Sequence, residues 1–179
     1  MIREQIIETN LFITKVEGHH EFKNKILDLI GEMPDASYEG VSKTDWNLPL
    51  DSTRNYLDFF YKHIGRPVMY QLSVFLGADN WKIHNGWFQQ YNENSSHTWH
   101  NHIGTNFSNV YFLELPDVND KTQIKYLRTN SLTEYEVEEG DLLTFPAHLL
   151  HRSKPNLGGR KTVISFNSDF IYKNGDKQE

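Results

Sequence analysis

The chain has 179 residues, of which 37% are hydrophobic and 23% charged, and its formal net charge is −6 at pH 7. This length suits one domain and is short for two, and the negative charge argues against nucleic acid as a partner, because phosphate binding needs a basic surface. Cysteine is absent, which excludes disulfides, thiolate zinc sites, iron–sulfur clusters and a cysteine nucleophile. Any bound metal must therefore have nitrogen and oxygen ligands.

The hydrophobic residues are spread along the chain in short runs. No run approaches the length of a transmembrane helix, and the first twenty residues lack the pattern of a secretory signal peptide. The sequence therefore predicts a cytoplasmic protein with no membrane partner.

The first half of the chain has the spacing of amphipathic helices. Apolar residues recur at helical spacing over residues 20–32 and again over residues 51–64, where Asp51 and Ser52 are possible N-caps. Pro67 can begin a further helix that ends at Gly77. We expect residues of about 1–80 to form a mainly helical support.

From about residue 81 the pattern changes to short strands separated by turns. Residues 87–91, 109–115 and 161–166 are rich in β-branched and aromatic side chains. Strands a dozen or so residues apart are typical of an antiparallel barrel or sandwich. The sequence predicts one α+β domain over 1–179, mainly β, whose β core spans about 81–172 and packs against the N-terminal helices.

Three of the nine histidines lie in the stretch His97-Thr98-Trp99-His100-Asn101-His102. Residues two apart on a strand point to the same face, so His100 and His102 can present their imidazoles to one point. His97 would face the other way and is a weaker candidate. A second segment, 139–146, reads as a turn and an apolar strand, and it is followed by His148 and His151.

Several segments, in this order and spacing, resemble the iron(II)- and 2-oxoglutarate-dependent oxygenase superfamily. The chain is most similar to a small bacterial and phage branch that carries His-x-His where other members carry His-x-Asp. The resemblance covers residues of about 85 to 170 and implies a double-stranded β-helix, or jelly roll. It is carried by Tyr91, His100-Asn101-His102, residues 109–113, residues 140–151, Pro155-Asn156 and residues 160–167.

The resemblance also implies a set of site residues. His100 and His151 would ligate iron, and Arg160, with Thr162 beside it, would bind the far carboxylate of 2-oxoglutarate, because the planar guanidinium matches a carboxylate bidentately. Tyr91 matches a position where related enzymes offer a phenol to the same carboxylate. The implied reaction hydroxylates an unidentified substrate and releases succinate and CO2.

The sequence departs from the majority pattern at His102, because non-haem iron oxygenases usually add one carboxylate to two histidines. Three explanations are open: His102 itself ligates, a distant Asp or Glu takes its place, or the position stays vacant. We expect His102 to ligate, since imidazole is a good ligand and the spacing directs it to the same point.

Two other functions compete with this reading. A cupin-type three-histidine metal dioxygenase would use no 2-oxoglutarate, but cupins usually carry a Glu shortly after His-x-His, and none follows here. A non-catalytic jelly-roll binding module would not need to retain His100, His151 and Arg160 together. The substrate, a small molecule or a peptide, is not identified by the sequence, and an oligomer is possible.

Overall fold

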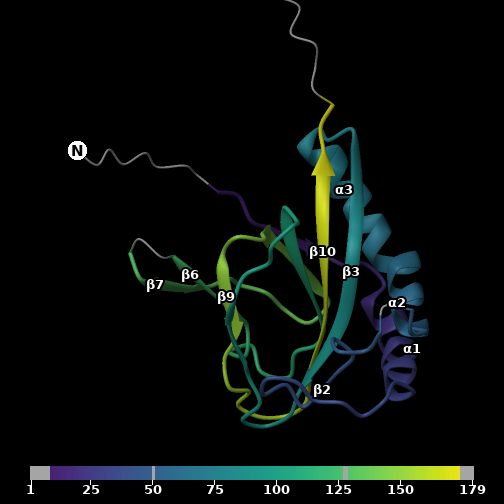
Figure 1. The fold of residues 1–179 in the computed structure, drawn as a ribbon, viewed down its shortest axis with the longest axis vertical. Helices are drawn as coiled ribbons and strands as arrows, with labels where there is room; N and C mark the ends of the chain where they lie inside the picture. The colour runs from purple at the N-terminus through teal and green to yellow at the C-terminus, as the bar shows by residue number, and fades with distance from the viewer. Residues whose placement is uncertain (1–8, 50, 127–128, 174–179) are drawn as a thin grey trace, which may run out of the picture.

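The computed structural model describes residues 9–49, 51–126 and 129–173, which fold into two antiparallel sheets with helices on one side (Figure 1). The larger sheet has the strand order β1-β8-β5-β10-β3-β2, and the smaller has the order β4-β9-β6-β7. The strands are β1 (Phe12–Lys15), β2 (Lys43–Thr44), β3 (Asn80–Tyr91), β4 (His97–His100), β5 (Phe107–Glu114), β6 (Thr122–Tyr126), β7 (Ser131–Glu134), β8 (Asp141–Pro146), β9 (Leu150–Ser153) and β10 (Lys161–Ile171).

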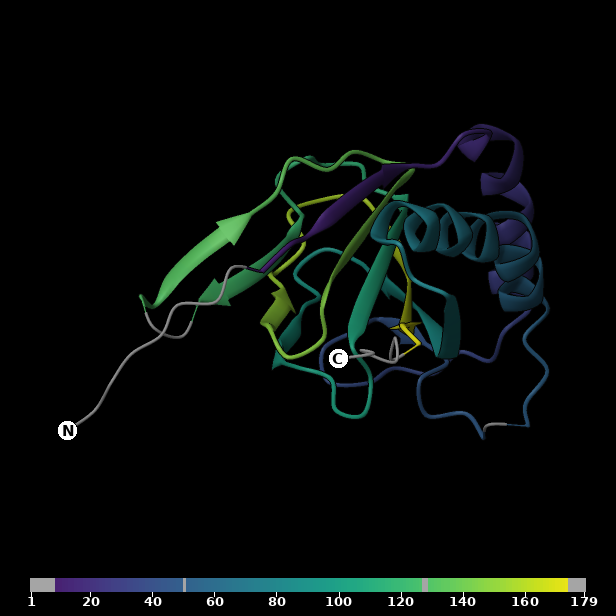
Figure 2. The same ribbon diagram turned by 90° about the horizontal axis from the view of Figure 1, so that it is seen from above.

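The helices cover the outer face of the larger sheet, and the smaller sheet lies on its other face (Figures 1 and 2). They are α1 (His19–Gly31), α2 (Asn55–Phe60), a π-helical turn η1 (Tyr61–Gly65) and α3 (Arg66–Leu76). The predicted helices over 20–32 and from Pro67 are confirmed, and α3 ends at Gly77 with the left-handed φ of 65° that glycine favours. None of these described helices is long and apolar enough to cross a membrane.

The helix predicted over 51–64 differs in detail. It starts at Asn55, after Arg54, so Asp51 and Ser52 do not cap it, and its last turn is π-helical. The N-terminal part also contributes the edge strands β1 and β2 to the larger sheet, which the helical spacing did not indicate.

Two cores result from the period-two alternation of the central strands. On β5, Tyr111 and Leu113 pack toward the helices, whereas Val110 and Phe112 belong to the core between the sheets. Strands β8 and β10 divide in the same way, as Ile164 and Val163 illustrate. One face of β10 therefore looks into the space between the sheets.

A buried carboxylate joins the helices to the larger sheet. Asp45 is 1% exposed, and it accepts hydrogen bonds from Arg54 Nε at 2.8 Å, from the Tyr56 hydroxyl at 2.7 Å and from the Phe88 backbone N–H at 3.0 Å. It thereby fixes α2 against β3 and holds the neighbouring Trp46 in place.

We predict that Asp45→Ala lowers the free energy of unfolding by about 3–5 kcal/mol, because the largely buried Arg54 guanidinium loses its charge partner and the Tyr56 hydroxyl and the Phe88 N–H lose their acceptor. Chemical denaturation measures the loss. Asp28→Ala, on the exposed face of α1, is the control and should change stability by less than about 0.5 kcal/mol. A loss of similar size in both variants would contradict this role for Asp45.

Candidate metal centre

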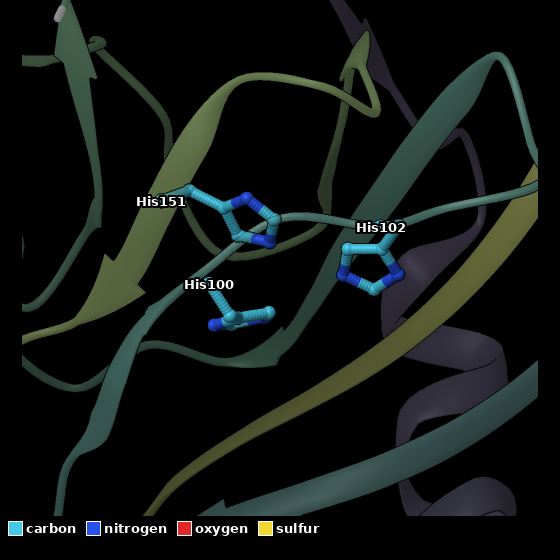
Figure 3. A group of neighbouring side chains, drawn as sticks. All are labelled: His100, His102 and His151. Atoms are coloured by element: carbon cyan, nitrogen blue, oxygen red, sulfur yellow. The ribbon is translucent and has the colours of Figure 1, made fainter.

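Three imidazoles converge between the two sheets. Antiparallel pairing of β4 with β9 sets His100 directly opposite His151, and His102 lies just past β4, where its backbone N–H donates to the Ala147 carbonyl at 2.9 Å. One ligand atom from each of the three histidines lies within 4.8 Å of the others, and the rings point toward one another (Figure 3). Within the described ranges this is the one group of three or more such side chains arranged to hold a metal ion, and it includes no carboxylate.

Backbone carbonyls fix the protons of two of these rings. His100 Nδ1 lies 2.8 Å from the Thr98 carbonyl and His151 Nδ1 lies 2.9 Å from the Leu149 carbonyl. Because a carbonyl oxygen only accepts, each Nδ1 must carry the proton, which leaves the Nε2 lone pair free to bind a metal.

Burial keeps the cluster neutral at pH 7. Burial, with a smaller contribution from the nearby His100 imidazole, lowers the pKa of His151 to about 3 and that of His102 to about 4, and burial also lowers the pKa of His100. Neutral imidazole is the form that binds metal. The donor set therefore fits a divalent transition-metal ion, and its nitrogen ligands suit iron or zinc better than magnesium or calcium.

The predicted orientation of His97 is wrong, although its ranking as a weaker ligand candidate is confirmed. The register of β4 against β9 shifts between His97 and His100, and this irregularity turns the His97 ring to the same side, where its centroid lies 4.2 Å from that of His100. Gln89 Nε2 lies 3.2 Å from His97 Nδ1. His97 thus borders the cluster without belonging to the group that could hold the metal.

A buried lysine shares the cavity with the histidines. Lys161, at the start of β10, is 2% exposed and lines the same cavity as His100 and His151. Its ammonium donates to the Asp120 carbonyl at 2.9 Å and to the Ser153 hydroxyl at 2.5 Å, and it lies 4.5 Å from the centre of the Tyr91 ring. Burial lowers the pKa of Lys161 to about 8, so the side chain is mainly cationic at pH 7.

Of the residues expected to bind the 2-oxoglutarate carboxylate, Tyr91 lines this cavity, whereas Arg160 and Thr162 do not. The Arg160 guanidinium is half exposed and forms a bidentate pair with Glu114, with hydrogen bonds of 2.9 and 2.8 Å. The Thr162 hydroxyl donates to the same carboxylate. Both therefore stabilise the rim of the sheet.

Lys161 was not identified from the sequence as a residue of the cavity, although the alternation of side chains along β10 indicates it. Val163 and Ser165 line the cavity, and Lys161 shares their phase on β10, whereas Thr162 points to the opposite face. Alternation along β10 therefore places Lys161, and not Thr162, on the face toward the cavity. His148 lies exposed on the turn between β8 and β9 and lines none of the cavities described here.

No protein-family model matches the chain, and no curated protein matches its sequence. Solved structures match its fold. A collagen prolyl hydroxylase from Paramecium bursaria Chlorella virus 1, in complex with 2-oxoglutarate, is 12% identical with a TM-score of 0.60, over 88% of this chain and 94% of that one.

Two further structures extend the comparison. A 2OG-Fe(II) oxygenase-family oxidoreductase from Burkholderia pseudomallei is 10% identical with a TM-score of 0.67, over 92% of this chain and 88% of its own. The non-haem α-ketoglutarate-dependent epimerase SnoN from nogalamycin biosynthesis is 9% identical with a TM-score of 0.68, over 94% and 83%. The chain therefore has the jelly-roll fold of the 2-oxoglutarate and iron(II) oxygenases, which confirms the predicted fold.

We predict that His100→Ala and His151→Ala each weaken binding of iron(II) by more than the roughly 10–100-fold that loss of an outer-shell partner costs. Anaerobic competition with a chromogenic chelator measures the affinity. His148→Ala is the matched control and should bind iron(II) as the unchanged chain does. Equal affinity in His151→Ala and in the control would exclude the metal centre.

Proposed function

We propose that the protein is an iron(II)- and 2-oxoglutarate-dependent oxygenase. The observation that supports it most strongly is the combination of a neutral three-histidine cluster and a buried cationic lysine in one cavity, on a fold that known 2-oxoglutarate oxygenases share. A metal site alone would need no buried ammonium group. The negative charge of the buried Asp120 offsets part of the cost of burying Lys161, and a bound dicarboxylate would offset more of it.

His100, His102 and His151 would hold the iron on one face and leave the other positions for 2-oxoglutarate and O2. Bound iron(II) and 2-oxoglutarate would supply the oxidation: one oxygen atom of O2 would be incorporated into succinate as CO2 is released, and the other would become the hydroxyl oxygen of the product. The carbonyl acceptors of Thr98 and Leu149 would keep the two imidazoles in the metal-binding tautomer.

A three-histidine set is compatible with 2-oxoglutarate in charge. Iron(II) with the 2-oxoglutarate dianion is neutral, and three neutral imidazoles leave it so, whereas a carboxylate ligand would make it −1. The absence of a carboxylate from the described cluster therefore does not weaken the proposal, and it favours ligation by His102 over replacement by a distant acid.

Lys161 would bind the far carboxylate of 2-oxoglutarate. Its ammonium is held by two oxygen acceptors and keeps donor capacity for a third, and the Tyr91 ring shields it from water. In this role Lys161 replaces the Arg160 that the resemblance indicated, because the Arg160 guanidinium is already paired with Glu114.

Hydroxylation of a peptide or a small molecule is the outcome that we propose, with hydroxylases among the proteins of similar fold. Another protein of similar fold is an epimerase, so a reaction other than hydroxylation is the alternative outcome. The fold alone does not choose between them, because function depends on the residues around the site.

We predict that Lys161→Ala raises the Kd of 2-oxoglutarate by at least about 30-fold, since losing one partner of a buried charge pair costs about 2–5 kcal/mol. The titration is anaerobic, with iron(II) bound, and follows the weak visible charge-transfer band of a chelated 2-oxo acid. Arg160→Ala, which breaks a half-exposed pair, should change the Kd by less than about fivefold.

The same titration separates the alternatives. A larger loss of 2-oxoglutarate affinity in Arg160→Ala than in Lys161→Ala would indicate that Arg160 binds the far carboxylate. Iron(II) binding with no band at any concentration of 2-oxoglutarate would contradict the proposed function and favour a cupin-type dioxygenase.

We also predict that 2-oxoglutarate binds more weakly as the pH rises through about 8, because Lys161 then loses the proton that makes it cationic. The histidines, whose pKa values are lowered, stay neutral throughout this range. Titrations at pH 7, 8 and 9 measure the effect. Lys161→Arg stays charged at pH 9, so an equal loss of affinity in that variant would contradict the assignment.

A further inference from the structure

A second hollow, of about 370 Å³, opens beside the histidine cluster. It shares His97, His100 and His102 with the inner cavity, but it does not reach Lys161. Its remaining lining is mostly aromatic and amide, and Glu39 is its single carboxylate, with no lysine or arginine among the described lining residues. We call this hollow the outer cleft.

The Glu39 carboxylate has no close cationic partner among the described residues. Its Oε2 lies 3.8 Å from His97 Nε2, which is beyond hydrogen-bonding distance, and 48% of its side chain is exposed. A carboxylate that has no cation within hydrogen-bonding distance and is in contact with water remains available to bind a cationic group that enters the cleft.

The backbone at Glu39 is strained. Glu39 has a φ of 45° and Gly40 a φ of 85°, and the Val41 N–H donates to the Tyr38 carbonyl at 2.9 Å, as in a tight turn of type I′. Such turns favour asparagine, aspartate or glycine at the Glu39 position, since longer L side chains are disfavoured at positive φ. Strain of this kind is found where a side chain is needed in one position.

The turn is fixed against the strand that carries the histidines. The Ser96 N–H donates to the Gly40 carbonyl at 3.1 Å, and a Cβ at residue 40 would meet the Ser96 carbonyl oxygen at 2.9 Å, so glycine is required there. The Glu39 carboxylate is thereby held next to His97, whose ring borders that of His100.

An aromatic surface completes the cleft. Trp46 is 42% exposed, lines the cleft and packs edge-on against Trp87, with ring centroids 4.3 Å apart. The Trp87 ring in turn stacks on His102 at 5.7 Å. A partly exposed indole and a carboxylate that line one cleft can bind a cation together, through the ring quadrupole and the negative charge.

We propose that the outer cleft selects a substrate that carries an amine or guanidinium group a few bonds from the carbon that is oxidised. Glu39 binds the cationic group and Trp46 packs against it, and the chain of the substrate then leads past His97 to the metal. That the bound molecule is a substrate rests on the proposed oxygenase function. Recognition of a cation by the cleft does not depend on that function.

The test uses four blocked tripeptides, acetyl-Gly-Xaa-Gly-amide, in which Xaa is lysine, arginine, norleucine or glutamate. Binding is followed by tryptophan fluorescence, to which Trp46 and Trp87 in the cleft respond. Each peptide is titrated anaerobically into protein loaded with iron(II) and 2-oxoglutarate, and also into protein without added metal. We expect the lysine or the arginine peptide to bind about tenfold more tightly than the norleucine and glutamate peptides.

Two variants separate recognition from folding. Glu39→Gln removes the charge at nearly constant shape, and Glu39→Asn also supplies the residue that the turn favours. Both should lose the preference for a cation, while Glu39→Asn should melt no lower than the unchanged chain. Asp35→Asn, an exposed carboxylate four residues away that does not line the cleft, is the control and should keep the preference.

Persistence of the preference in Glu39→Gln, tighter binding of the norleucine peptide, or no binding of any peptide would each overturn the inference. The proposed function fails separately: it is lost if 2-oxoglutarate produces no charge-transfer band with iron(II), whether or not the cation preference is found.

Discussion

Antiparallel pairing between two four-residue strands is the constraint on which the candidate centre depends. Because β4 and β9 pair with His100 opposite His151, two imidazoles from positions 51 residues apart in sequence meet at one point. The carbonyls that accept the Nδ1 protons lie two residues before each histidine, at Thr98 within β4 and at Leu149 just before β9. One backbone arrangement therefore sets both the position and the tautomer of these two rings, and the contact of His102 with Ala147 adds the third.

The period of two along β10 divides charged groups between two environments. Lys161 looks into the cavity with Val163 and Ser165, while Thr162 points to the opposite face and, with Arg160, binds Glu114 at the rim. A buried cation in a cavity and a half-exposed cation at the rim have different uses: the first strongly attracts an anionic ligand, and the second contributes little beyond a surface ion pair. Because neighbouring residues on β10 face opposite sides, a shift of one residue along the strand would change which side chain faces the cavity and can contact a bound dicarboxylate.

The sequence was sufficient for the parts of the molecule that depend on local patterns. Helical spacing located α1 and α3, alternation located the central strands, and the resemblance indicated the jelly roll and the three histidines. The rest depends on register and on contacts between distant segments. The irregularity in β4 that turns His97 inward, and the positive φ of Glu39 beside that histidine, leave no periodic trace in the sequence. Alternation along β10 was sufficient to place Lys161 on the cavity face, but the resemblance pointed to the neighbouring Arg160.

The most direct test of the account is electron paramagnetic resonance of the iron(II)-loaded protein with nitric oxide, used as an unreactive stand-in for O2. Three histidine ligands leave room for chelated 2-oxoglutarate and one diatomic ligand at the same time. We expect an S = 3/2 signal whose line shape changes when 2-oxoglutarate is added, and we expect the signal to be lost in His151→Ala. A signal that 2-oxoglutarate leaves unchanged, or that survives in His151→Ala, would contradict a three-histidine centre that binds 2-oxoglutarate.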